Sequence, residues 1–198
     1  AGSTDTFTVV LDAQPTSDVV ITVTPNDTTE VSTTGTLTFT PINWDTPQTV
    51  TVTGVDEDIV DGTITSAITL AVVDATSNDN FDAVADQTVS VSTTDDDVAG
   101  FTIVELDGAT EVDESGTTDT FTVVLDAQPT SDVVLTITSD DTGEATVNSS
   151  LTFTSANWDT PQTVTVTGAD DSIIDGTITS IATVAVDDAN SDNDFDAV

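Results

Sequence analysis

The chain has 198 residues, enough for one or two domains, and its composition restricts the functions open to it. It contains 37 Asp and Glu residues and no Lys, Arg or His, and this net charge of −37 disfavours binding to nucleic acid or to anionic lipid. It has no Cys, its apolar runs are too short to be inserted into a membrane, and its acidity predicts an extracellular or cell-surface setting rich in dissolved cations.

A repeat without gaps divides the chain. Residues 1–84 match residues 115–198 at an offset of 114, with 57 identities in 84 positions. This repeat predicts two tandem domains, 1–97 without its first strand and 98–198 without its last. We interpret the chain as a window from a longer tandem array. The alternative is that a neighbouring chain supplies the missing strand by β-augmentation.

Short alternating stretches rich in Val, Ile and Thr predict strands, and no segment has sustained helical spacing. Strands are expected at 7–11, 19–24, 37–40, 49–53, 64–73 and 88–94 in the first repeat, and at 101–105, 121–125, 133–138, 151–154, 163–167 and 178–186 in the second. Six or seven short strands in roughly a hundred residues are typical of a sandwich. The chain is therefore predicted to be all-β, with tandem antiparallel β-sandwiches of immunoglobulin-like type.

The aromatic residues are predicted to lie in the cores. Trp44 and Trp158 precede Asp-Thr-Pro turns, and we interpret both as core aromatics beneath a loop, with exposed sugar-binding aromatics as the alternative. Six Phe residues are expected in the core as well: Phe7, Phe39, Phe81, Phe121, Phe153 and Phe195. The acidic stretches 78–82 and 192–196 are predicted to be polar turns, with a peripheral ion site as the weaker alternative, because they lack the central Gly and closing Glu of an EF-hand.

Three consecutive carboxylates, Asp95, Asp96 and Asp97, lie where one repeat gives way to the next. They repel one another, and the chain holds no cationic side chain to offset them. We therefore predict a bound metal ion there, with a solvated acidic linker as the alternative. An oxygen-only ligand set without His or Cys favours Ca²⁺ over zinc or copper.

Several of these segments resemble a known family. Residues 95–101, an Asp triplet followed by Val-Ala-Gly-Phe, resemble the domain junction of Calx-beta domains, and residues 55–62 resemble the acidic loop of that family. Residues 111–116 resemble its early Glu-containing bend. Residues 43–50 with 78–81 resemble the Calx-beta-like tandem repeats of large bacterial extracellular or cell-surface proteins.

The resemblance implies a calcium-binding, Calx-beta-like sandwich with ions at the tip where domains join. By position it implies these ligands: Asp27, Asp56, Glu57, Asp61, Asp95, Asp96, Asp97, Glu114, Asp141, Asp170, Asp171 and Asp175. The chain departs from the family pattern where Asp58 becomes Ser172 in the second repeat. The first repeat also lacks the early Glu, and the second lacks the closing triplet.

No catalytic activity is expected. The triplet 141–143, Asp-Thr-Gly, matches one half of an aspartic-protease site, but the first repeat has no partner triplet. Paired carboxylates of the glycosidase kind are too common here to be informative. No His, Lys, Cys or Tyr is present to act as base or nucleophile.

The predicted function is that of a calcium-binding structural repeat in an extracellular adhesin or matrix protein, acting as a calcium-rigidified stalk. Its expected partners are the neighbouring repeats of the same chain. One alternative is a subunit of a self-assembling extracellular filament, in which like chains complement each other's strands. A further alternative is a glycan-binding module.

Overall fold

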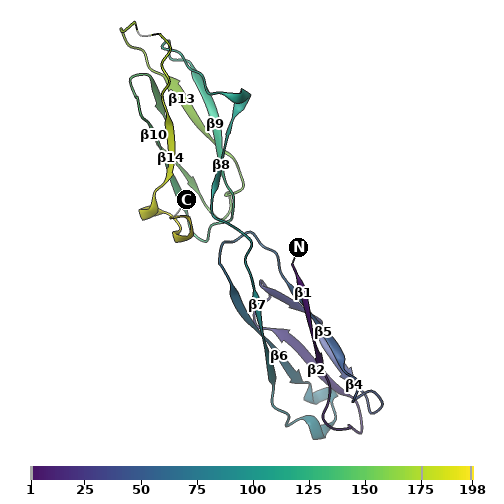
Figure 1. Cartoon of the computed structure of the whole chain (residues 1–198). Coiled ribbons are helices and arrows are strands. Elements are labelled where there is room, and N and C mark those ends of the chain that lie inside the picture. Colours follow the sequence, from purple (N-terminus) through teal and green to yellow (C-terminus); the bar gives the residue numbers. More distant parts are fainter. Residues whose placement is uncertain (1, 175, 197) are drawn as a thin grey trace. The chain divides into compact units, whose positions relative to one another are not determined.

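A computed structural model of the chain describes residues 2–174, 176–196 and 198. The chain forms two compact units, the first unit holding strands β1–β7 and the second unit strands β8–β14 (Figure 1). The helical segments of the described residues are single 3₁₀ turns, and none of them is a candidate membrane span.

The first unit is built from two antiparallel sheets. The three-stranded sheet has the order β1 (Thr4–Val9), β5 (Gln48–Gly54), β3 (Val31–Thr33). The four-stranded sheet has the order β4 (Thr36–Phe39), β2 (Val19–Pro25), β6 (Ile64–Val72), β7 (Gln87–Thr93). Two 3₁₀ turns, η1 (Asp74–Thr76) and η2 (Asp79–Phe81), connect β6 to β7.

The second unit repeats this plan, but the sheet that has three strands in the first unit has four here, and the sheet that has four has three. Its four-stranded sheet has the order β11 (Ala145–Val147), β13 (Gln162–Gly168), β9 (Thr118–Leu125), β8 (Phe101–Glu105). Its three-stranded sheet has the order β12 (Ser150–Phe153), β10 (Val133–Ser139), β14 (Ala182–Val186). The 3₁₀ turns are η3 (Leu106–Gly108), η4 (Asp188–Asn190) and η5 (Asn193–Phe195).

Each unit has an apolar core made by the inward-facing residues of both its sheets, which confirms the predicted all-β antiparallel sandwich. In β2 the inward positions Val19, Ile21 and Val23 are buried, and β10 repeats the pattern. Phe39 and Phe153 are fully buried at equivalent places. Burial of one such side chain contributes about 1.5–3 kcal/mol, so these alternating strands hold each sandwich together.

The aromatic predictions are confirmed. Trp44 and Trp158 are half-buried and pack against the cores of their own units. The six predicted Phe residues are either buried or pack against a core. The stretches 78–82 and 192–196 form turns around η2 and η5, in which Asn78 and Asp192 cap the backbone.

Two strand predictions are wrong. The short strands β3 and β11 were not expected, because each has three residues and only its first residue, Val31 or Ala145, is fully buried. The strand expected at 178–186 begins only at Ala182. Its counterpart β6 begins at Ile64 and pairs with β7 from Ile64 to Leu70, whereas β14 has only β10 as a strand neighbour among the described residues.

Candidate metal centre

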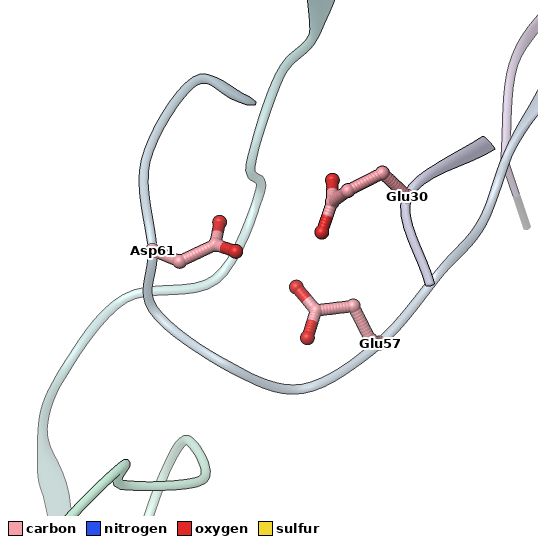
Figure 2. A group of neighbouring side chains, drawn as sticks. All are labelled: Glu30, Glu57 and Asp61. Carbon is pink, nitrogen blue, oxygen red and sulfur yellow. The ribbon is translucent and has the colours of Figure 1, made fainter. Parts of the chain in front are cut away.

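Three carboxylates of the described residues converge on one small volume. Glu30, Glu57 and Asp61 each place one oxygen so that the three atoms lie within 4.8 Å of one another. Glu30 is buried, Glu57 is half-buried and Asp61 is exposed, so the cluster runs from the protein interior to solvent. Figure 2 shows the three carboxylates facing a common space, with Glu57 and Asp61 on one loop and Glu30 on another segment.

Glu30 is held by a hydrogen-bonded turn between β2 and β3. The carboxylate of Asp27 accepts hydrogen bonds from the hydroxyl of Thr29, at 2.5 Å, and from its backbone N–H, at 3.0 Å. These two bonds lower the pKa of Asp27, the hydroxyl having the larger effect. The carbonyl of Glu30 accepts a 2.8 Å hydrogen bond from the N–H of Val55, which ties this turn to the end of β5.

Glu57 and Asp61 come from the loop that connects β5 to β6. Gly62 follows Asp61 with a φ of 75°, a left-handed conformation that favours glycine. Its N–H donates a 2.8 Å hydrogen bond to the carboxylate of Asp95. The first aspartate of the triplet therefore fastens the loop beside Asp61, while Asp56 on the same loop is exposed.

The electrostatics of the cluster favour a bound cation. Two unit charges about 4–5 Å apart repel by roughly 3–4 kcal/mol at an effective dielectric of 20, so three such pairs cost on the order of 10 kcal/mol. The chain contains no Lys, Arg or His that could offset this repulsion. A cation bound there would offset it, and a set of hard oxygen donors open to water on one side fits Ca²⁺.

The second unit carries the equivalent residues of this cluster. Glu144 corresponds to Glu30 and is half-buried, and its carbonyl accepts a 2.8 Å hydrogen bond from Ala169, as that of Glu30 does from Val55. Asp171 corresponds to Glu57, and its carboxylate accepts a 2.7 Å hydrogen bond from the N–H of Ile173. Asp175, the counterpart of Asp61, lies outside the described residues.

The other predicted ligands are not members of the three-residue group. Asp96 is exposed and Asp97 is half-buried. Asp141 is exposed and its carboxylate accepts a 3.0 Å hydrogen bond from the N–H of Gly143, and Asp170 is also exposed. Glu114 is exposed in a turn next to Asp113. The pKa of Asp113 is lowered by two hydrogen bonds from Ser115, and the bond from the hydroxyl has a larger effect than the bond from the N–H. Their roles as ligands stay predictions.

Sequence reasoning missed Glu30, although it is the most buried member of the cluster. A signal for it was available in the repeat. Residues 28–36 and 142–150 differ at most positions, yet both copies keep Glu, at 30 and at 144. An acid retained inside a variable stretch, directly before a strand, indicates a position with a specific structural demand.

The fold and the cluster together define the class: an antiparallel β-sandwich protein with a cluster of three carboxylates. No protein-family model matches the sequence, and none of the curated proteins is significantly similar to it.

Two solved structures are similar in outline. The crystal structure of the calcium binding domain CBD12 of CALX1.1 matches with 15% identity and a TM-score of 0.32, over 85% of this chain and 70% of that one. The structure of CBD12 from CALX1.2 matches with 13% identity and a TM-score of 0.31, over 92% and 72% of the two chains.

Proposed function

We propose that the chain is a calcium-binding structural repeat of an extracellular adhesin or matrix protein, and that calcium stiffens it into part of a stalk. The observation that supports this most strongly is the convergence of Glu30, Glu57 and Asp61 in a chain without cationic side chains. The role is structural and not catalytic, since the sequence has no His, Lys, Cys or Tyr. Its partners are the neighbouring repeats of the same chain.

A calcium ion at this cluster would join two loops that come from different parts of the chain. Glu30 lies at the end of the turn between β2 and β3, and Glu57 and Asp61 lie in the loop between β5 and β6. The hydrogen bonds from Val55 to Glu30 and from Gly62 to Asp95 already fix the backbone on either side. An ion would replace the mutual repulsion of the carboxylates by attraction, and so stabilise the folded unit by mass action.

The test compares thermal unfolding in calcium, in magnesium and in chelator. Calcium at about a hundred times its Kd stabilises by about 2.7 kcal/mol, which shifts the Tm of a unit of this size by on the order of 10 °C. Glu57→Gln combined with Asp61→Asn should abolish most of this shift. Asp45→Asn, which removes an exposed turn carboxylate, is the matched control and should retain it. An unchanged calcium shift in the double variant would place the ion elsewhere.

The stalk itself is tested by small-angle scattering. The maximum dimension of the chain should be larger in calcium than in chelator, because the ordered loops restrict bending. Equal dimensions in the two buffers would contradict the stiffening role, although the chain could still bind calcium.

A further inference from the structure

The peptide bond between Asp61 and Gly62 joins two residue types that rearrange spontaneously in proteins. Glycine has no Cβ to shield its backbone nitrogen, so that nitrogen can attack the side-chain carboxyl of an aspartate directly before it. The chain contains three Asp–Gly steps, at 61–62, 107–108 and 175–176. The step at 61–62 lies in the loop between β5 and β6, and both of its residues are exposed.

The local geometry leaves the nitrogen of Gly62 accessible and restrains it by a hydrogen bond. Gly62 has a φ of 75°, and a Cβ added there would meet no atom within 4 Å, so packing does not shield this bond. The N–H of Gly62 donates a 2.8 Å hydrogen bond to Oδ2 of Asp95. The carboxylate of Asp95 therefore holds the group that would have to attack Asp61.

We propose that Asp61–Gly62 is a site of spontaneous isoaspartate formation and that the carboxylate of Asp95 protects it. The hydrogen bond must break before the nitrogen of Gly62 can turn toward Cγ of Asp61. In addition, the attacking nitrogen carries negative charge after it loses its proton, and the adjacent carboxylate of Asp95 disfavours that charge. The first aspartate of the triplet thus preserves the covalent structure of the loop, a role that does not require it to bind a metal ion.

The modification proceeds in two steps that neither oxidise nor reduce the chain. In the first step a bond forms between the nitrogen of Gly62 and Cγ of Asp61. The hydroxyl of the protonated carboxyl group leaves as water with the amide hydrogen, which gives a five-membered imide. In the second step water adds to the former backbone carbonyl of Asp61, and the bond from that carbon to the nitrogen breaks. The chain then runs through Cγ, and the former backbone carbonyl is a free carboxylate.

This modification would take Asp61 out of the carboxylate cluster. An isoaspartate adds one carbon to the backbone and leaves its carboxylate on a side chain that is shorter by one carbon, a change of about 1.5 Å. The oxygens of Glu30, Glu57 and Asp61 lie within 4.8 Å of one another, so their convergence depends on the length of each side chain. Protection by Asp95 therefore preserves the cluster over the lifetime of the protein.

The positions of the glutamates allow the modification to be measured at this one step. Cleavage after Glu57 and Glu105 releases residues 58–105, which contain 61–62 as their only Asp–Gly step. The isoaspartyl form has the same mass, elutes separately and is located by electron-transfer fragmentation. The whole chain is incubated at neutral pH in chelator, so the result does not depend on calcium binding. Asp95→Ala should raise the rate of isoaspartate formation at 61 by about tenfold, because a hydrogen bond to a charged acceptor is lost.

Matched variants distinguish protection by Asp95 from a general effect of charge. Asp96→Ala removes the neighbouring exposed carboxylate and should leave the wild-type rate unchanged. Asp95→Asn keeps an oxygen acceptor without the charge, so its rate should lie between those of the wild type and Asp95→Ala. Trp44 fluorescence verifies that the first unit is folded in each variant. Equal rates in Asp95→Ala and Asp96→Ala, or no isoaspartate at 61 in folded Asp95→Ala, overturn the proposal.

Two internal references complete the experiment. In urea the hydrogen bond from Gly62 to Asp95 is absent, so the wild type and all variants should react at the same rate. If Asp95→Ala remains faster in urea, the folded structure is not the source of protection and the proposal fails. The digest also releases residues 106–111, which contain the step at 107–108. Its rate should be the same in all variants, and a parallel rise there in Asp95→Ala contradicts specific protection of Asp61–Gly62.

Discussion

The two units differ in how their seven strands are divided between two sheets. The first unit has three strands in the sheet of β5 and four in the sheet of β2, and the second unit reverses these numbers in the sheets of β13 and β10. The difference arises because the segment between the repeats supplies β7 to the first unit and β8 to the second. Among the described residues, β1 and β14 have no such neighbour, and each is shorter than its counterpart β9 or β6. The end of a strand is thus set by its neighbour as much as by its own sequence.

The largest expected effect tests whether the two cores are equivalent despite this difference. Phe39 and Phe153 are both fully buried, so Phe39→Ala and Phe153→Ala should each destabilise their own unit by about 3–5 kcal/mol. The chain has two Trp residues and no Tyr, so Trp158→Phe leaves Trp44 as a reporter of the first unit, and Trp44→Phe leaves Trp158 for the second. Urea unfolding followed by fluorescence measures each unit. A loss in the unit that carries no Ala substitution would mean that the units do not unfold independently.

The second prediction concerns the acidic cluster: one substitution should change the stability of the first unit in opposite directions in chelator and in calcium. Glu30→Gln removes one carboxylate of three, so it should stabilise the first unit in chelator by relieving repulsion. In calcium it should destabilise the unit by about 2–3 kcal/mol through weaker ion binding. The equivalent change Glu144→Gln provides the comparison in the second unit. Thermal unfolding in the two buffers measures both, and a change of the same sign in both buffers contradicts the repulsion argument.

The third prediction sharpens the contrast between β9, which lies between β13 and β8, and β1, whose one strand neighbour among the described residues is β5. Val123 is fully buried beside β8, so Val123→Ala should cost about 2 kcal/mol. Val9 is the equivalent residue of the first repeat and is half-buried, so Val9→Ala should cost about 1 kcal/mol or less. Urea unfolding of the two variants gives the difference directly. Equal costs would show that Val9 is as well packed as Val123.

Most of the fold could be predicted from the sequence, because strand alternation and the repeat are local signals. Val19, Ile21 and Val23 alternate with Thr and Val, and the register of β2 in its sheet follows from that alternation. The residues 178–181 carry the same kind of pattern but do not form a strand, so alternation alone does not determine where a strand begins.

The candidate site was predictable only in part. Glu57 and Asp61 belong to an acidic loop that is visible in the sequence. Glu30 lies 27 residues before Glu57 in the chain, and only the pairing of β3 with β5 brings it to that loop. Its Thr-rich surroundings hold two acids, Asp27 and Glu30, and do not show by themselves which of the two reaches that loop. Both repeats have Glu at this position, at 30 and at 144, and comparing them was the one way to identify this residue from the sequence.

The smallest expected effect concerns a turn in which the two units use different side chains. Asp192 is buried and accepts 2.7 Å hydrogen bonds from the N–H groups of Thr130 and Ser131. Burial alone would raise its pKa, but the hydrogen bonds from Thr130, Ser131 and Asp194 together outweigh burial and lower the pKa. Its counterpart Asn78 instead donates to the hydroxyl of Thr16, at 2.6 Å, and does not titrate.

This contrast predicts a pH dependence that belongs to one unit. The contribution of Asp192 is fully present above the pKa of about 3.9 that an unfolded Asp has, and it is lost as the pH falls through the lower pKa of the folded state. Asp192→Asn should therefore make the second unit less sensitive to acid, while lowering its stability at neutral pH because donors of Thr130 and Ser131 lose a charged acceptor. Asn78→Asp should make the first unit more sensitive to acid, since Thr16 and Ser17 match Thr130 and Ser131. Urea unfolding between pH 3 and pH 7, followed through Trp44 and Trp158 separately, measures both. If the two variants shift the acid sensitivity of their units in the same direction, the turn does not determine it.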